Sequence, residues 1–292
     1  MPHILDGKKV AQKLKDKLKI EIENLKYKFK KVPGLAVIQI GNVAASNVYV
    51  KAKTKAAEEV GINVFDHHLE DTTNQIELIN LINQLNNNKD VDGILVQLPL
   101  PNTINEEAVL NSILPEKDAD GFHPLNVGKL SISAKNDENL MIPCTPYGCL
   151  LLLRELNINL AGKNAVVIGR SNIVGKPMAQ LLLKESCTVT TVHSKTINIE
   201  SICKKADILI AAIGKPEFVN KDWVKEGAII IDVGINRVKI NEEKSKLVGD
   251  VFLSDVEHKV SAISPVPGGV GPMTIACLLR NTTIAFKNSN KI

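Results

Sequence analysis

The 292-residue chain is poor in aromatic side chains, which make up 3% of it, and it lacks any long block of one charge. Its 36 basic and 32 acidic residues leave a formal net charge of +4. The lysine-rich stretch 13–31 matches no nucleic-acid-binding module, and a helix with a solvated basic face explains it better. We therefore expect no nucleic-acid partner, and cores built from Ile, Val, Leu and Ala.

Cysteines are few and unpatterned. The five of them are scattered without a CxxC pair, which argues for a reducing compartment and against a disulfide framework or structural zinc. Residues 1–6 show neither a signal-peptide nor a transit pattern. The uncharged stretch 260–279 is long enough to cross a bilayer, but three prolines and three glycines predict a loop and a helix start instead. A cytoplasmic protein without a membrane segment is expected.

Apolar periodicity predicts alternating strands and helices, typical of an α/β protein with parallel sheets. The expected strands are 35–40, 62–69, 93–98, 165–168, 188–192, 207–213 and 228–232. The expected helices are 44–60, one opening at Thr73, 177–184, one from Pro272 to about Phe286, and a first one capped by Asp6 with the stripe Val10, Leu14, Leu18, Ile22, Leu25 and Phe29. In the helix from Thr73, we expect Ile76, Ile79, Ile82 and Leu85 to face inward.

The length and a restart of this alternation after Thr145 predict two domains with a boundary near residue 144. We expect one domain from residues 1–143 with 273–292 and a second from residues 144–272. Prolines at 99, 101, 115 and 124 should interrupt regular structure, and residues 131–139 read as a mobile surface loop.

Gly169-Arg170-Ser171-Asn172-Ile173-Val174-Gly175 stands between a predicted strand and a predicted helix. Glycines there allow a sharp turn and close approach of the backbone to a phosphate at the helix N-terminus. Because the motif is not GxGxxG, an ordinary turn between strand and helix remains the alternative.

The next strand bears on the choice of nucleotide. NAD-binding folds usually carry an acid where that strand ends, whereas this chain has Val192-His193-Ser194-Lys195. Arg170 and Ser194 could hold a 2′-phosphate through charge-assisted hydrogen bonds, which favours NADP. A solvated arginine and a capping serine remain the alternative.

Ser46, Tyr49 and Lys53 would share one face of the helix 44–60. A lysine in a partly desolvated pocket can trade protons near neutral pH, and a neighbouring tyrosine offers a ring and a hydroxyl. Lysines at 51 and 55 also fit a solvated helix face, so this pattern alone leaves both interpretations open.

Polar side chains follow the predicted strand 93–98 and the loop after it. Gln97 lies at a strand end, where parallel sheets gather ligands. In the segment 117–124, an aspartate could pair with the adjacent N–H donors of a pterin ring. A metal site of Asp118, Asp120 and His123 is disfavoured because nothing else completes a ligand set.

Together these segments resemble the methylenetetrahydrofolate dehydrogenase/cyclohydrolase family, in the family's order and over nearly the whole chain. The matching segments are 45–53, 97–101, 117–124, 143–146, 169–175, 193–196, 232–236 and 265–274. Many members have an Asp-Pro-like pair where this chain has Val43-Ala44, which puts only the local loop shape in doubt.

The resemblance implies two α/β domains with a folate cleft between them, the C-terminal one a Rossmann-type doubly wound parallel sheet that binds NADP. It implies Lys53 as the acid/base of hydrolysis, Gln97 as the residue that tunes it, and Asp120 as the holder of the pterin. It also implies stacking by Tyr49, assistance by Ser46, and substrate contacts from Leu98, Pro99, Pro267, Gly268, Gly269, Val270 and Gly271. The implied dinucleotide contacts are Gly169, Arg170, Ser171, Ile173, Ser194 and Ile235.

The implied activity is NADP-dependent oxidation of 5,10-methylene-tetrahydrofolate, then hydrolysis to 10-formyl-tetrahydrofolate, without a metal and by a homodimer. A short-chain dehydrogenase also uses a Tyr-x-x-x-Lys set, but there the nucleotide turn precedes it, whereas here the turn follows. A monofunctional dehydrogenase or a silent folate or NADP sensor remain alternatives, and the retention of Lys53 and Gln97 argues against both.

Overall fold

The structure is a computed structural model that describes residues 1–42, 44–134, 139–241 and 245–292, without the side chains of residues 44–46. The chain divides into two compact units. The three-stranded unit comprises Gln12–Cys144 with Ile275–Ile292, and the six-stranded unit comprises Met1–Ala11 with Thr145–Thr274. Residues 1–11, which we expected in the N-terminal domain, thus lie in the six-stranded unit.

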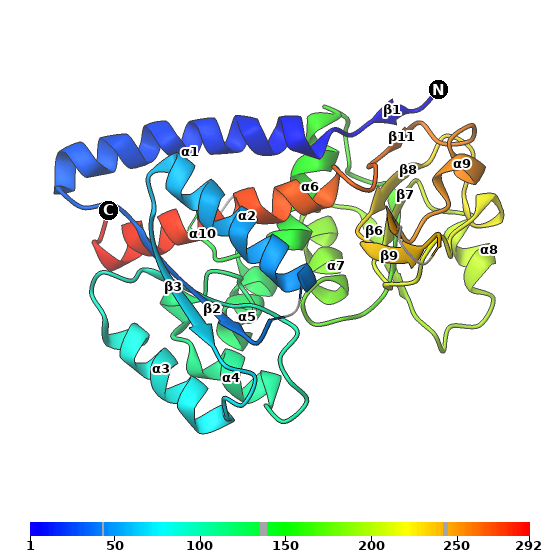
Figure 1. Cartoon of the computed structure of the whole chain (residues 1–292). Coiled ribbons are helices and arrows are strands. Elements are labelled where there is room, and N and C mark those ends of the chain that lie inside the picture. The colour runs from blue at the N-terminus through cyan, green and yellow to red at the C-terminus, as the bar shows by residue number, and fades with distance from the viewer. Residues whose placement is uncertain (43, 135–138, 242–244) are drawn as a thin grey trace. The chain divides into compact units, whose positions relative to one another are not determined.

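The three-stranded unit is built on a parallel sheet of order β3-β2-β4 (Figure 1). Its strands are β2 (Gly34–Ile40), β3 (Asn63–Leu69) and β4 (Gly93–Val96). All seven residues of the central strand β2 are buried, as expected for a strand covered on both faces. The helical elements are α1 (Gly7–Phe29) from Gln12 on, α2 (Ala44–Val60), α3 (Gln75–Asn87), α4 (Glu106–Ser112), η1 (Pro115–Lys117), α5 (Pro124–Ile132) and the later part of α10 (Val270–Ser289).

Helix α1 confirms the stripe expected from its sequence, with Leu18, Ile22 and Leu25 buried. Asp6 caps its start, because its carboxylate accepts the Lys9 N–H at 3.1 Å. Pro115 and Pro124 interrupt the chain less than expected, since each begins a short helix at a first-turn position. Of the expected loop 131–139, residues 131–132 belong to α5 and residues 135–138 lie outside the described residues.

Helix α3 differs from the expectation in its start and in its buried face. Asn74 caps it in place of Thr73, accepting from the Ile76 and Glu77 N–H groups in a capping box. The prediction that Ile76 faces inward is wrong, because that side chain is 72% exposed. The buried face is Leu78, Ile82 and Leu85, whose i, i+4, i+7 spacing places them on one stripe.

The six-stranded unit holds a parallel sheet of order β1-β11-β8-β7-β5-β6. Its strands are β1 (His3–Ile4), β5 (Asn164–Ile168), β6 (Thr188–Val192), β7 (Ile208–Ala211), β8 (Ile229–Asp232) and β11 (Ala262–Ile263), and an antiparallel pair joins β9 (Asn236–Lys239) to β10 (Ser245–Val248). Its helical elements are α6 (Cys144–Glu155), α7 (Gly175–Lys184), α8 (Ile199–Cys203), η2 (Lys221–Trp223) and α9 (Leu253–Val256). Because β1 pairs with β11, the first residues of the chain extend this sheet.

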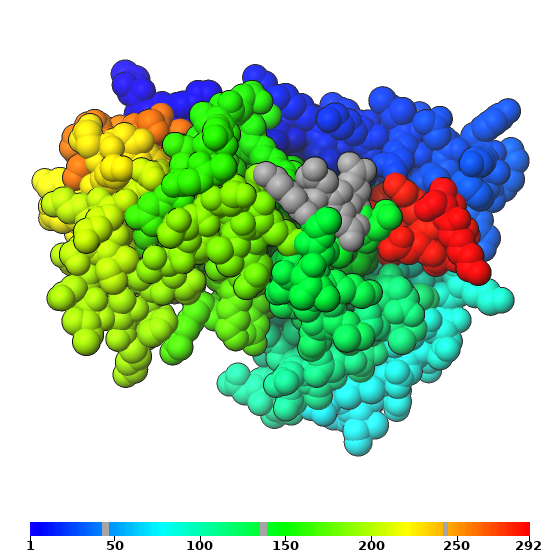
Figure 2. All heavy atoms as spheres, turned by 180° about the vertical axis from the view of Figure 1, so that it is seen from behind, coloured from blue at the N-terminus to red at the C-terminus, as the bar shows by residue number. Residues whose placement is uncertain are grey.

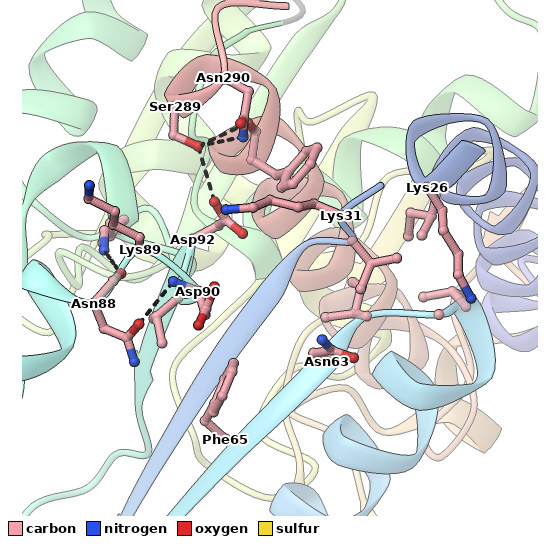
Figure 3. Close-up of a pocket in the computed structure, with 18 of the residues that line it drawn as sticks. Lys26, Lys31, Asn63, Phe65, Asn88, Lys89, Asp90, Asp92, Ser289 and Asn290 are labelled. Atoms are coloured by element: carbon pink, nitrogen blue, oxygen red, sulfur yellow. Dashed lines mark hydrogen bonds between the residues drawn. The ribbon is translucent and has the colours of Figure 1, made fainter. Parts of the chain in front are cut away.

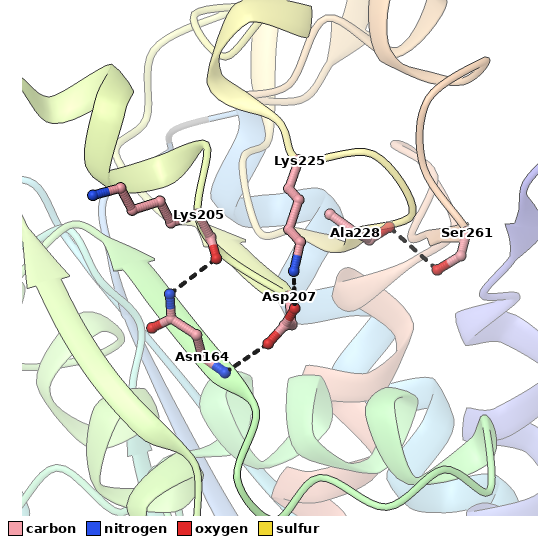
Figure 4. Close-up of polar contacts among 6 residues, drawn as sticks. All are labelled: Asn164, Lys205, Asp207, Lys225, Ala228 and Ser261. Atoms are coloured by element: carbon pink, nitrogen blue, oxygen red, sulfur yellow. Dashed lines mark hydrogen bonds and ion pairs between the residues drawn. The ribbon is translucent and has the colours of Figure 1, made fainter.

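Polar contacts fasten the amino ends of these strands to one another (Figure 4). The Asp207 carboxylate accepts the Asn164 N–H at 2.9 Å and the Lys225 ammonium at 2.5 Å. The bond from Lys225 is the main cause of a lowered pKa at Asp207. The Asn164 side chain also donates to the Lys205 carbonyl at 2.9 Å. These bonds tie the amino end of β5 to the segments that lead into β7 and β8.

Residues 260–279 form β11, a loop and the first half of α10. Among the described residues, no helix combines the length and apolarity needed to cross a membrane. Helix α10 ends at Ser289, and the last residues of the chain lie at the surface (Figure 2).

Candidate active site and dinucleotide site

Lys53 and Gln97 meet at the carboxyl end of the three-stranded sheet. Lys53 projects from α2 with only 6% of its side chain exposed, and its ammonium donates to the Gln97 Oε1 at 3.0 Å. Gln97 follows β4, where its N–H still pairs with the Ile38 carbonyl at 2.8 Å, and its own amide donates to the Leu98 carbonyl at 2.6 Å. The pairing of Gln97 with Ile38 and its bond to the Leu98 carbonyl together fix the Gln97 Oε1, which accepts the hydrogen bond from Lys53.

Tyr49 lies one helical turn before Lys53 and is half-buried. Burial raises the pKa of its hydroxyl, so the group stays protonated at physiological pH. Ser46 lies in the same helix, but its side chain is outside the described residues, as is Val43 of the departing pair. The start of α2 is held by a buried Gln39, whose amide donates to the Gly41 carbonyl and to the Asn47 side chain.

Asp120 is electrostatically coupled to Lys53. Burial raises the pKa of Asp120 to about 6, the charge of Lys53 acts in the opposite direction, and the carboxylate of Asp118 raises it further. A carboxyl group that titrates near 6 beside a buried ammonium is typical of a site that binds or transfers protons. Lys53, Gln97 and Asp120 thus form one polar cluster within this unit.

Asp118 has a different role from the one considered in the sequence. Its carboxylate accepts the N–H groups of Gly121, Phe122 and His123 at 3.0, 3.1 and 2.8 Å, while His123 accepts the Leu125 N–H at the start of α5. Both side chains are therefore engaged with the backbone, and the described residues contain no group of three or more metal-ligating side chains. The pattern Asp-x-x-Gly was the available signal for this turn.

A pocket of about 1340 Å³ opens at the other edge of the three-stranded sheet (Figure 3). It surrounds the amino ends of the strands, near Asn63 and Asp92, and contains none of Tyr49, Lys53, Gln97 or Asp120. Burial raises the pKa of Asp92, whose carboxylate accepts the Gly34 N–H at 2.9 Å and the Ser289 hydroxyl at 3.0 Å. These bonds join the start of β2 to the end of α10, so the Asp92 carboxylate serves to hold the fold together.

In the six-stranded unit, the turn from β5 to α7 needs both of its glycines. Gly169 has φ +117°, and a Cβ there would lie 2.2 Å from the Ala212 carbonyl oxygen. A Cβ at Gly175 would lie 2.3 Å from the Gly169 carbonyl oxygen. The Ser171 hydroxyl accepts the Val174 and Gly175 N–H groups at 3.2 and 3.3 Å. The turn is thus tight, and it begins a helix whose N-terminus favours an anion.

Arg170 and Ser194 occupy matching positions on neighbouring strands. Ile168 of β5 pairs with Val192 of β6, and each of the two side chains follows its strand by two residues and is exposed. No acid stands at the end of β6; instead the His193 N–H donates to the Thr196 hydroxyl at 2.9 Å. An exposed guanidinium and hydroxyl at one sheet edge fit a phosphate on the ribose of a dinucleotide.

Two buried aspartates organise the loops after β7 and β8. Asp232 accepts the N–H groups of Gly234, Asp250 and Val251, each at 2.9 Å, while burial raises the pKa of Asp232 to about 7. Asp250 accepts the N–H groups of Ile213, Gly214 and Lys215 at 2.7, 3.0 and 2.9 Å. No pattern in the sequence indicated a role for Asp250. The partly buried Ile173 lies in the turn before α7, and the 45% exposed Ile235 lies in the loop between β8 and β9.

The loop before α10 is compact. The Gly269 N–H donates to the Pro265 carbonyl at 2.8 Å, and a Cβ at Gly7 would lie 1.7 Å from the Gly269 carbonyl oxygen. Gly268 has φ +105°, and the Val266–Pro267 peptide bond is cis, as is Leu98–Pro99. Pro267 is exposed, Gly268 and Gly271 are half-buried, and Val270 begins the helix buried.

Both halves of the chain match domain descriptions of one known family. Residues 5–120 match the family description "Tetrahydrofolate dehydrogenase/cyclohydrolase, catalytic domain", and residues 143–290 match its "NAD(P)-binding domain". A relative named "Bifunctional protein FolD" from Wolbachia sp. subsp. Brugia malayi is 55% identical, over 100% of this chain and 98% of its own length.

Solved structures agree with these matches. The bifunctional FolD enzyme from Campylobacter jejuni has a TM-score of 0.93 at 48% identity, covering 99% of this chain and 100% of its own. The Trypanosoma brucei methylenetetrahydrofolate dehydrogenase-cyclohydrolase, solved with NADP and an inhibitor, has a TM-score of 0.94 at 39% identity, covering 100% and 99%. The chain is therefore an enzyme with an NAD(P)-binding domain, and it belongs to the tetrahydrofolate dehydrogenase/cyclohydrolase family.

Proposed function

We propose that this enzyme oxidises 5,10-methylene-tetrahydrofolate to the methenyl form with NADP⁺ and then hydrolyses that product to 10-formyl-tetrahydrofolate in one-carbon metabolism. The observation that carries the proposal is the buried Lys53, hydrogen-bonded to Gln97 and electrostatically coupled to Asp120. A dehydrogenase alone needs alignment of substrate and cofactor, whereas hydrolysis also needs a group that moves protons.

Each residue of this cluster receives a role. Lys53 is the acid/base, Gln97 holds its ammonium, and Asp120 accepts N–H groups of the pterin ring. Tyr49 stacks on the aromatic part of the folate, and Ser46 assists. The remaining proposed substrate contacts are Leu98, Pro99, Pro267, Gly268, Gly269, Val270 and Gly271.

NADP is the proposed cofactor, held by Gly169, Arg170, Ser171, Ile173, Ser194 and Ile235. The glycine turn, the N-terminus of α7 and the exposed Arg170 and Ser194, which follow adjacent strands, fit its phosphates. When bound, it accepts the hydride that leaves the methylene carbon of the substrate. The chain's own part in this step is to align the reactants and exclude water.

In the hydrolytic step, water adds to the cationic methenyl carbon, and the neutral amine form of Lys53 Nζ takes one of its protons and becomes the ammonium. The same ammonium then returns a proton to N5 as the bond from that nitrogen to carbon breaks. The second water proton leaves to solvent, so that one formyl group and one proton are produced. Gln97 keeps Nζ on the side of the reacting carbon throughout, because its own amide is fixed by the Leu98 carbonyl.

An absorbance assay tests this function. Purified protein is mixed with 5,10-methylene-tetrahydrofolate and either NADP⁺ or NAD⁺, and reduced nicotinamide and the methenyl form are followed together. We expect reduction with NADP⁺ and loss of the methenyl signal faster than its spontaneous hydrolysis. Reduction without accelerated hydrolysis would leave a dehydrogenase alone, and folded protein that reduces neither nucleotide would leave a silent binding protein.

A homodimer and a cytoplasmic location complete the proposal. The family resemblance supports the homodimer, and light scattering coupled to gel filtration tests it. All five cysteines are buried and none forms a disulfide in the part of the chain that the structure describes, which agrees with a reducing compartment.

A further inference from the structure

The turn that carries Asp120 is held from several directions by buried polar side chains outside the substrate-contacting set. Asp118 is 2% exposed and Asn281 is fully buried. Neither belongs to the set to which we assign substrate contacts, yet each makes several hydrogen bonds to residues around Asp120. Such a network costs desolvation free energy, so its geometry calls for an account of what it fixes.

Asp118 fixes the residues that follow Asp120. Both of its oxygens accept backbone N–H groups, from Gly121 and Phe122 on one and from His123 on the other. The Asn126 amide of helix α5 donates to the second oxygen at 2.8 Å and to the Pro115 carbonyl at 2.7 Å. The turn is thereby tied to α5 and to η1.

Asn281 fixes the residue before Asp120. Its amide, on helix α10, donates to the Ala119 carbonyl at 2.9 Å and to the Ile142 carbonyl at 2.8 Å. A single side chain therefore bridges the 119–120 peptide and the segment that enters α6. The Cys144 N–H closes the arrangement by donating to the Asp120 carbonyl at 3.2 Å.

Gly121 shows how little room this arrangement leaves. It has φ +76°, and a Cβ there would lie 2.5 Å from the Ile142 carbonyl carbon. The backbone on both sides of Asp120 is thus fixed, and the position of the carboxylate depends on the rotamer of that one side chain.

We propose that Asn281, together with Asp118 and Asn126, is a positioning residue that sets the place of the Asp120 carboxylate for the pterin ring. The inference rests on the proposed function, because it takes Asp120 as the group that receives the pterin. A side chain that served only stability would leave substrate affinity unchanged once the protein is folded. A positioning residue changes the KM for the folate substrate in particular.

The first test is Asn281→Leu, which keeps the side-chain size and removes both donors. The matched control is Thr283→Val, two residues along the same helix, where a buried hydroxyl donates within α10, to the Leu279 carbonyl at 2.9 Å. The readout is KM for 5,10-methenyl-tetrahydrofolate in the hydrolysis assay, which needs no nucleotide. We expect KM to rise about tenfold or more in Asn281→Leu, since a misplacement of about 1 Å can cost about a hundredfold.

In Thr283→Val we expect KM within about twofold of the parent enzyme, because the turn keeps all its bonds. If Asn281→Leu does not fold, Asn126→Ala takes its place, since it removes the two bonds by which Asn126 ties Asp118 to α5 and to the Pro115 carbonyl, and a rise in KM is again expected. An unchanged KM in the folded variant, with only its thermal stability lowered, would overturn the inference.

A double variant separates this inference from the proposed function. If Asn281 acts through Asp120, Asn281→Leu adds little to the KM of Asp120→Ala, whereas independent effects multiply. Multiplied effects would overturn the positioning role while leaving Asp120 in place. An unchanged KM in Asp120→Ala itself would instead overturn the assignment of Asp120, and the positioning role with it.

Discussion

At the scale of single residues, Lys53 differs from its neighbours on α2 in burial. Lys51 and Lys55 are exposed, whereas Lys53 is 6% exposed and hydrogen-bonded to Gln97. We predict that Lys53→Met lowers kcat for methenyl hydrolysis by about a hundredfold or more, the usual contribution of one acid/base group. NADP⁺ binding should not change, because the residues that we propose bind the dinucleotide belong to the six-stranded unit, whereas Lys53 belongs to the three-stranded unit.

Lys55→Met is the matched control for this prediction, since it removes the same charge from the exposed face of the same helix. Stopped-flow loss of the methenyl absorbance measures both variants. Hydrolysis at a near-normal rate in Lys53→Met would contradict the acid/base assignment.

Asp120 predicts a pH dependence of substrate affinity. Burial raises the pKa of this carboxyl to about 6. Above that pH it is ionised and can accept pterin N–H groups, and below it protonation removes the charge that accepts them. We therefore predict that KM for the methenyl substrate rises by up to about tenfold for each pH unit below 6. Steady-state hydrolysis from pH 5 to 8 measures this.

Asp120→Asn should give a KM that is higher at pH 8 and flat across the same range, because the amide does not titrate. A parent enzyme with flat KM, or an equally steep profile in Asp120→Asn, would assign the pH dependence to another group.

The sequence could predict the residues proposed to take part in the reaction, but not the buried residues that fix the surrounding backbone. The Lys53–Gln97 pair was implied by the family resemblance, and the structure brings the two into a hydrogen bond. Asn281 and Asp250 were missed, because each acts on backbone groups far away in the sequence, as Asn281 does on Ala119 and Ile142. A side chain that satisfies distant carbonyls leaves no local pattern.

At the scale of elements, the turn from β5 into α7 depends on Gly175. A Cβ there would lie 2.3 Å from the Gly169 carbonyl oxygen and 2.8 Å from the Arg170 Cα, so both residues of the proposed phosphate site must shift. We predict that Gly175→Ala destabilises the protein by about 1–3 kcal/mol, as overpacking does. It should also weaken NADP⁺ binding by about tenfold or more, since about 1.4 kcal/mol is tenfold.

Gly128→Ala is the contrasting substitution. Gly128 is exposed within α5, and a Cβ there would meet nothing within 4 Å. The alanine should stabilise the helix by about 0.5–1 kcal/mol and leave NADP⁺ binding unchanged. Urea unfolding and isothermal titration measure both variants, and equal NADP⁺ affinity in Gly175→Ala would remove this turn from the dinucleotide site.

Element boundaries show where sequence patterns stop being informative. Strand β6 and helix α2 begin and end where periodicity and a stop signal predict, with Gly61 following α2. The buried face of helix α3 was predicted wrongly because isoleucines occur at 76, 79 and 82, so that two apolar stripes are possible on the helix. Packing against β2 and β4 selected the stripe through Leu78, and tertiary contacts of that kind are not local in the sequence.

At the scale of the whole molecule, both units are discontinuous in sequence, and one tryptophan reports on only one of them. Trp223 is the single tryptophan of the chain. It is 4% exposed and packs in the core of the six-stranded unit. The centroid of its ring lies 5.1 Å from that of the Phe218 ring. Its fluorescence therefore follows the unfolding of the unit that we propose binds NADP.

We predict that NADP⁺ at about a hundred times its Kd stabilises the Trp223-reported transition by about 2.7 kcal/mol, the value that mass action gives for one site on the native state. Urea unfolding followed by tryptophan emission measures this shift. In Arg170→Ala the shift at the same NADP⁺ concentration should shrink, while the shift with NAD⁺, which has no 2′-phosphate, should stay as in the parent protein. Equal losses for both nucleotides would show that Arg170 acts on a part of the ligand they share, and the preference for NADP would then have to come from Ser194 or its neighbours.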